Sequence, residues 1–409
     1  MSRAIILLVL LLCSCQKKVS YQAPVASQLE QRLNSSLQVA KSGGRNQYKN
    51  IAESALLQTY SGHEEKAAEA YDQAYKLSEA HYSRSLRELT FSKILNESVK
   101  TFRPHYLEKW HLLLMASLNR WSMGDNEGAA VELRRLSRDI RLEKDPFGEK
   151  RSNEAKQAYL SFTGLIFYAL ERGDESFSDL HKAYSYGKDD LDDDILRLYH
   201  YLSYTRGKTK DKPAELPDYL QDFLQNRSLI VRLKDQGPQK EERRLSLTMV
   251  EYWPVIHGYM QESSAQEQKI SSVEDVVLGT LGRRVISIAY PVFVSRCSPA
   301  LSAYEHPVLN YDELLLESWQ LQRNRLIAQN ILRVTFKVIA SQKVSSLIED
   351  NVGGGWGTLL GNLGAMAVWK TEKADIRQLF YLPAQLMISF PRAGKLPNGS
   401  VKLRRQGLF

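Results

Sequence analysis

The chain has 409 residues, of which 43% are hydrophobic and 25% are charged. At about 150 residues per domain, this length predicts two or three domains that can fold without disulfide or metal staples. The share of apolar residues excludes a wholly disordered chain and a polytopic membrane protein. The 55 basic and 47 acidic residues give a formal net charge of +8. This excess is spread along the chain, and we expect no nucleic-acid binding.

The first 15 residues predict a lipid-modified N-terminus. Arg3 supplies a positive charge, and an unbroken apolar run follows at 4–12. Such a run has the length of a signal-peptide core and about half that of a membrane span. The next residues, Leu-Cys-Ser-Cys at 12–15, resemble the lipobox of bacterial lipoproteins. The resemblance implies a signal peptide at 1–14 and lipidation of Cys15. A plain signal peptide cut near Ser14, or a short anchor, is the alternative.

The residues after Cys15 predict the location. Gln16 follows the cysteine, and retention in the inner membrane usually needs aspartate there. We therefore expect a protein anchored by lipid to the outer membrane, on its periplasmic side, with a lipidated tether at 15–27. Of the three cysteines, Cys297 alone would remain as a free thiol. We expect Cys297 to behave as a small buried apolar residue, because no disulfide partner is left for it.

Residues 28–225 predict a helical domain, because their apolar residues recur at spacings of three and four. Three turns resemble the middle of the tetratricopeptide repeat (TPR), in which a glycine ends one helix and small residues let the next helix pack closely. Equivalent small residues lie 62 and then 47 residues apart, against about 34 in that repeat, so we expect an interrupted array with additional helices near 80–103. A generic helical bundle is the alternative. The matching residues are Gly62, Ala67, Tyr71 and Ala74; Gly124, Ala129, Leu133 and Leu136; and Gly164, Phe167, Ser176, Leu180 and Ala183, with a shifted turn at 173–175.

Other features of this half have structural interpretations. The acidic run at 189–194 lacks the spacing of a calcium loop and predicts a helix cap. Aromatic residues at helical spacing predict packing between helices, with a glycan-binding platform as the alternative. These aromatic residues are Tyr60, Tyr71, Tyr75, Trp110, Trp121, Tyr168 and Tyr184.

Residues 226–409 predict a smaller α+β domain, so the fold class of the whole chain is α+β. Alternating apolar residues predict strands at 245–249, 284–294, 385–390 and 401–403 in a short, mainly antiparallel sheet. A Pro-Asn-Gly turn at 397–399 predicts that the last two strands form a hairpin. A long helix is expected from Asp312 to about residue 350.

Two segments near the C-terminus allow more than one interpretation. Glycine or alanine recurs every four residues within 353–369, which predicts a tightly packed or partly flexible core helix. The alternatives are a contact with a membrane surface or a partner helix, and a ligand loop. Basic residues gather in the tail, where a solvated sheet edge is the first interpretation and contact with anionic lipid or glycan the second. They are Arg392, Lys395, Lys402, Arg404 and Arg405.

A short motif suggests a family. Residues 371–377 (TEKADIR) and 382–385 (LPAQ) resemble the C-terminal signature of an uncharacterised family of proteobacterial TPR-containing outer-membrane lipoproteins. Leu379 replaces the tryptophan that is usual in this signature. Members are often encoded near lipoproteins related to activators of peptidoglycan synthases. Asp375 and Arg377 match the motif, and we expect a structural ion pair there, with a catalytic or ligand pair as the alternative.

The sequence carries no recognisable catalytic motif, and its eight histidines lack metal-binding spacing. We therefore expect no enzyme, no cofactor and no bound metal. The hypothesis is a periplasm-facing scaffold or regulator of an envelope machine, whose partners are envelope proteins of unknown identity. The alternatives are a module that binds peptidoglycan or lipopolysaccharide, and a cell-wall hydrolase.

Overall fold

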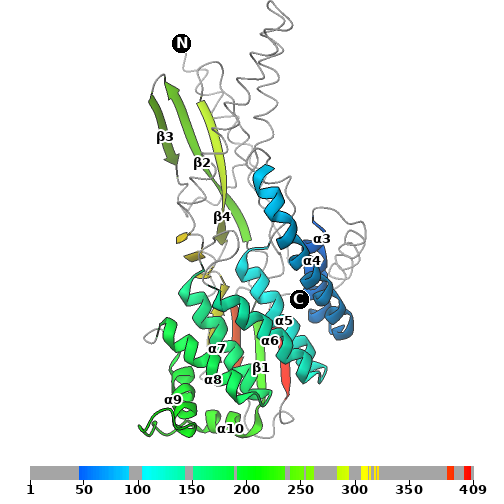
Figure 1. Ribbon diagram of the computed structural model, residues 1–409, viewed down its shortest axis with the longest axis vertical. Helices are drawn as coiled ribbons and strands as arrows, with labels where there is room; N and C mark the ends of the chain where they lie inside the picture. Colours follow the sequence, from blue (N-terminus) through cyan, green and yellow to red (C-terminus); the bar gives the residue numbers. More distant parts are fainter. Residues whose placement is uncertain are drawn as a thin grey trace, which may run out of the picture.

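The helical half of the molecule is an array of antiparallel helix pairs. The computed structural model (Figure 1) describes residues 46–91, 104–142, 151–187, 191–234, 240–252, 255–261, 283–293, 305–311, parts of 313–321, 385–390 and 400–406. The described part of this half has eight helices: α3 Gln47–Tyr60, α4 Glu64–Phe91, α5 Tyr106–Ser122, α6 Asn126–Arg141, α7 Asn153–Ala169, α8 Gly173–Tyr186, α9 Asp193–Thr205 and α10 Asp218–Asn226. The predicted helical array is thus confirmed, although α4 continues to Phe91 where an additional helix was expected from about residue 80.

The first helix of each pair ends in the same hydrogen-bonded turn. In α5, the amide of Asp125 donates to the carbonyl of Arg120 at 2.9 Å, and equivalent bonds close α3, α7 and α9. This six-residue closure is the Schellman motif, which places one residue in the left-handed region. That residue is Gly62, Gly124 and Gly207 in three turns, but Glu171 at φ 64° in the turn after α7. The turn glycine predicted at Gly173 instead begins α8, two residues later.

Small residues bring the paired helices close together, as predicted. Ala67, Ala129 and Ser176 are fully buried, at the start of α4, α6 and α8. At Gly164 in α7, a Cβ atom would lie 2.7 Å from Cγ of Leu180 in α8. The backbones therefore approach to a distance that admits no side chain at this position.

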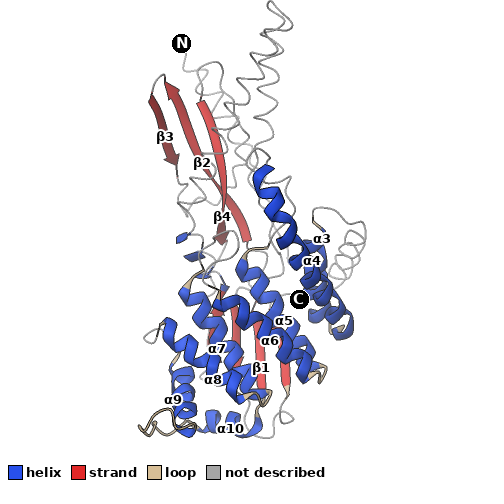
Figure 2. Ribbon diagram, in the orientation of Figure 1, coloured by secondary structure: helices blue, strands red, loops and turns tan. Residues whose placement is uncertain are grey.

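The described C-terminal residues form two sheets, drawn in red in Figure 2. A mixed sheet has the order β5-β6-β1-β7, with β1 antiparallel to β6 and parallel to β7. An antiparallel sheet has the order β3-β2-β4. The strands are β1 Leu229–Lys234, β2 Lys240–Tyr252, β3 Val255–Gln261, β4 Arg283–Phe293, β5 Glu305–Asn310, β6 Gln385–Ser389 and β7 Val401–Gln406.

The predicted hairpin between the last two strands is wrong. Strands β6 and β7 do not pair with each other, because β1 lies between them and pairs with both. Alternation of apolar residues marks a strand and its buried face, but it does not identify the neighbouring strand. Strand β1 was not predicted, because its short run Leu-Ile-Val-Arg-Leu-Lys is not joined to either partner strand by a recognisable turn.

The mixed sheet packs against the helical array. Strand β5 contacts α7, and β7 contacts α5. In Figure 1 this sheet lies directly behind the helices. Leu386, Ile388 and Phe390, which were predicted to share one face, are all buried. They belong to the same hydrophobic cluster as the array. The sheet therefore contributes to the core that the helices build.

Candidate binding site

The inner face of the array is covered by the chain itself. Helices α5 and α7 are buried along nearly their whole length. At the centre of this contact, the hydroxyl of fully buried Tyr311 lies 2.5 Å from Nδ1 of His111 and 3.0 Å from the hydroxyl of Tyr159. Nearby, Ser318 lies 2.9 Å from Nε2 of His105. The faces of α5 and α7, where a helical array would usually hold a partner, thus take part in the protein core.

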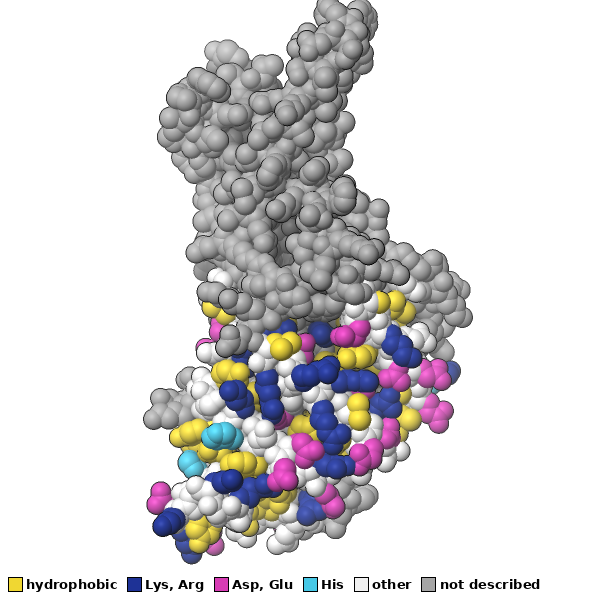
Figure 3. Space-filling view, in the orientation of Figure 1, with side chains coloured by type: hydrophobic (Ala, Val, Ile, Leu, Met, Phe, Trp, Pro, Cys, Tyr) yellow, Lys and Arg dark blue, Asp and Glu magenta, His cyan; other side chains and the backbone are white. Residues whose placement is uncertain are grey.

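A cleft remains open at the other end of the array, between α8 and α9. We call it the aromatic cleft; it has a volume of ≈ 350 Å³, at the lower end of the range of ligand pockets. Figure 3 shows histidine side chains beside hydrophobic ones over this region. Helix α8 supplies two of its lining residues and α9 three, and the turn after α9 supplies the rest. They are Phe177, His181, Tyr199, His200, Ser203, Lys208 and Thr209.

Near-parallel rings form the wall of the aromatic cleft. Phe177 and Tyr199 have centroids 6.0 Å apart at 17°, and Tyr184 stacks on Tyr199 at 4.8 Å and 24°. These residues meet because Phe177, His181 and Tyr184 follow one another at spacings of four and three, on one face of α8. Tyr199 is fixed further, since its hydroxyl lies 2.9 Å from Nδ1 of His181. The aromatic wall is therefore held in place before any ligand arrives.

The mouth of the aromatic cleft carries one basic side chain, that of Lys208. His181, His200 and Lys208 are exposed, and none of the described lining residues is acidic. The amide of Lys208 donates to the carbonyl of Ser203 at 2.8 Å, which fixes the backbone of this lysine through the turn after α9. The following residues, Thr-Lys-Asp-Lys at 209–212, add two lysines and one aspartate. The cleft thus offers an apolar surface beside one cationic side chain.

Arg206 supports the aromatic wall from outside. Its guanidinium lies 5.5 Å from the centroid of the Phe177 ring and also pairs with Asp174 at the start of α8. A cation above an aromatic face is attracted by the electron density of the ring. This contact holds the beginning of α8 to the end of α9, which keeps the two walls of the aromatic cleft in register.

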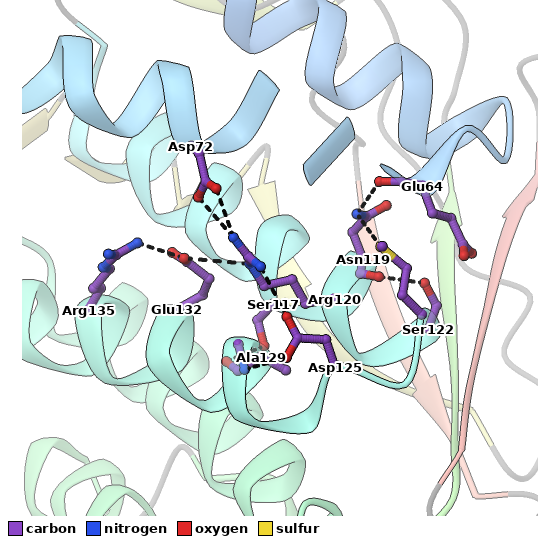
Figure 4. A network of polar contacts seen from close by, with 12 residues as sticks. Glu64, Asp72, Ser117, Asn119, Arg120, Ser122, Asp125, Ala129, Glu132 and Arg135 are labelled. Atoms are coloured by element: carbon purple, nitrogen blue, oxygen red, sulfur yellow. Dashed lines mark hydrogen bonds and ion pairs between the residues drawn. The ribbon is translucent and has the colours of Figure 1, made fainter. Parts of the chain in front are cut away.

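Other charged clusters in the described helices join one helix to the next. Figure 4 shows Arg120 of α5 between Asp72 of α4 and Asp125, the residue that caps α6. Glu132 accepts a hydrogen bond from Arg135 at 2.6 Å, and burial raises the pKa of this carboxyl, against the attraction of both arginines. Because each of these carboxylates is paired with an arginine, the cluster has the character of a structural network.

Asp179 forms a second such junction, which is more deeply buried. Its carboxylate accepts from the hydroxyls of Ser137 and Thr163 at 2.5 and 2.7 Å, and pairs with Arg141. Burial raises the pKa of Asp179, while the three donors act in the opposite direction. This one side chain therefore connects α6, α7 and α8.

The site residues predicted from the sequence, Cys15, Asp375 and Arg377, lie outside the described residues, as do Cys297 and the segment 353–369. Two other predictions can be placed. Asp192 caps α9 by accepting from the amides of residues 194 and 195, as expected of the acidic run. The aromatic residues Tyr71, Trp110 and Trp121 are buried between helices, as predicted.

The residues of the aromatic cleft were missed in the sequence analysis. The signal available was the spacing of Phe177, His181 and Tyr184, which places them on one helical face. That pattern also describes an ordinary packing face, and it does not reveal that Tyr199 and His200 of α9 lie opposite. The pairing of α8 with α9 was needed to recognise a cleft.

Comparisons of the chain with protein-family models, curated proteins and solved structures found no match. Within the described residues, no helix combines the length and the apolar character needed to cross a bilayer. The same residues contain no cluster of three or more side chains suited to hold a metal ion. The resemblance to TPR-containing lipoproteins therefore stays a prediction.

Proposed function

We propose that this protein is a lipid-anchored adaptor of the outer membrane that binds an envelope protein in the aromatic cleft. In this proposal Cys15 carries the lipid, and the chain faces the periplasm. The helical array is TPR-like, and the C-terminal residues form an α+β domain around the mixed sheet. The protein organises or regulates an envelope machine by holding one of its components near the membrane.

The aromatic cleft is the observation that carries this proposal. Aromatic residues in a pre-formed hollow are the usual anchors of protein interfaces. The stacking of Tyr184 on Tyr199 and the bond from Tyr199 to His181 hold the wall rigid, which lowers the entropy lost on binding. A lipid anchor would add to the affinity, because it raises the effective concentration of the adaptor beside a membrane-bound partner.

Site-specific photocrosslinking in intact cells tests the proposal. A photoreactive residue replaces Lys208 at the mouth of the cleft or, as the control, Lys66, an exposed lysine of α4. We expect a crosslinked envelope protein from position 208 and not from position 66. The yield should fall when Cys15→Ala removes the lipidation site, provided that fractionation shows release from the outer membrane.

Two outcomes would refute the adaptor. The first is equal crosslinking from positions 208 and 66, which would mean that the cleft has no special role. The second is a protein that crosslinks to nothing at 208 and releases soluble fragments from purified peptidoglycan, which would favour the hydrolase.

A further inference from the structure

The chemistry of the aromatic cleft points to one class of ligand. We propose that it binds an acidic segment of a partner protein, with one aromatic side chain of that segment inserted against Phe177 and Tyr199. This inference rests on the proposed function, because it names the kind of partner segment that the adaptor would hold.

The shape of the cleft fits a single aromatic side chain. Its volume of ≈ 350 Å³ is small for a ligand site, and its wall consists of rings within 12–29° of parallel. An aromatic ring that lies against the exposed side of this wall can adopt the offset arrangement that such rings prefer. The same contact removes apolar area of both partners from water.

The hydroxyl groups that line the cleft are already bonded within the protein. The hydroxyl of Ser203 donates to the carbonyl of Tyr199 at 2.8 Å, and that of Thr209 accepts from the amide of Asp211 at 3.2 Å. The hydroxyl of Tyr199 is bonded to His181. A sugar ring brings many hydroxyl groups that need new partners when they are buried, whereas an aromatic side chain brings none. The cleft is therefore better matched to a peptide than to a glycan.

The positive charge of Lys208 favours a partner segment that carries an acidic residue beside its aromatic residue. Lys208 is exposed at the mouth, and the described lining contains no carboxylate. Complementary charge speeds encounter and excludes partners of like charge. A segment with aspartate or glutamate beside its aromatic residue would place one of these acids near Lys208.

Selection from a random peptide library displayed on phage tests this chemistry with the full-length protein. Peptides selected on the wild type are counter-selected on Phe177→Ala and on Lys208→Ala. We expect enriched peptides with one aromatic residue and a net negative charge. Enrichment of basic or non-aromatic peptides, or no enrichment at all, would overturn the inference.

The enriched peptide then serves as the probe in fluorescence anisotropy. Loss of an aromatic anchor typically weakens binding about tenfold or more, and we expect this of Phe177→Ala. Lys208→Ala should weaken binding by about threefold to fivefold, less so at high salt. The matched controls are Tyr204→Ala and Lys210→Ala, since both residues are exposed and neither lines the cleft. Equal losses in the Lys208 and Lys210 variants would overturn the inference, even if Phe177→Ala impairs folding.

The two proposals fail separately. If an envelope protein crosslinks from position 208 but the peptide selection fails, the adaptor proposal remains supported and the proposal of an acidic aromatic ligand is refuted. Binding of soluble muropeptides that is lost in Lys208→Ala and kept in Lys210→Ala would show that the cleft takes a glycan instead.

Discussion

Substitution of Gly164 by alanine tests how closely α7 and α8 pack. The new Cβ atom would lie 2.7 Å from Cγ and 2.8 Å from Cδ2 of Leu180, and 3.3 Å from the carbonyl oxygen of Ser176. Carbon atoms prefer separations of about 3.5–4.0 Å. Leu180 is fully buried, so it has no solvent space to move into. Overpacking of this kind costs about 1–3 kcal/mol, and the rigid surroundings favour the upper end.

The helix itself would gain from this substitution. Alanine is better than glycine in a helix interior by about 1 kcal/mol. We therefore expect Gly164→Ala to lower the free energy of unfolding by about 2 kcal/mol net. The measurement is urea unfolding of the full-length protein, followed by circular dichroism.

A double-mutant cycle identifies the cause of this loss. Leu180→Ala alone should cost about 2–5 kcal/mol, because it leaves a cavity. In that background, Gly164→Ala should become neutral or stabilising, since the clash is gone and the gain in helix propensity remains. The expected coupling is about 2–3 kcal/mol.

The control for this cycle is Gly173→Ala. Its Cβ would meet the end of the Arg206 side chain at 2.7 Å, which can move aside, so we expect little loss of stability. The reasoning about α7 and α8 would be refuted if Gly164→Ala had the same effect with and without Leu180, or if it stabilised the wild type.

Four further substitutions test the stability of the array with the same unfolding measurement. Glu171→Gly should stabilise the protein by about 1 kcal/mol, because glycine adopts the left-handed conformation freely and the exposed ion pair with Arg227 contributes little. Gly124→Ala, at φ 82°, should destabilise it. A destabilising Glu171→Gly together with a stabilising Gly124→Ala would contradict the turn assignment. Burial raises the pKa of Asp179 above 3.8, so the folded protein favours the protonated carboxyl. The stability that this gives the folded protein is fully present below pH 3.8 and is lost as the pH rises through the raised pKa. Wild type should therefore lose stability relative to Asp179→Asn as the pH rises above 3.8, and parallel pH profiles would count against a raised pKa. Tyr311→Phe should cost about 2 kcal/mol, because the hydroxyl that bonds His111 and Tyr159 in the core is removed; an unchanged urea midpoint would mean that this contact does not hold the C-terminal residues to the array.

The helices of this protein could be predicted because their signals are local. Apolar residues three and four apart build a buried face, and glycine ends a helix wherever the left-handed conformation is needed. Gly62, Gly124 and Gly207 occupy such turns. In the third pair Glu171 takes the same conformation, and it could not be recognised, because its side chain gives no sign of the backbone it adopts.

The sheet order and the aromatic cleft were decided by the tertiary structure. Nothing in the run at 229–234 indicates that β6 and β7 would flank it, because partner strands are chosen by packing between distant segments. Phe177 and Tyr199 lie 22 positions apart on different helices, and their proximity follows from the packing of α8 against α9. A periodic pattern specifies the buried face of one element, whereas a cleft exists only where two elements leave space between them.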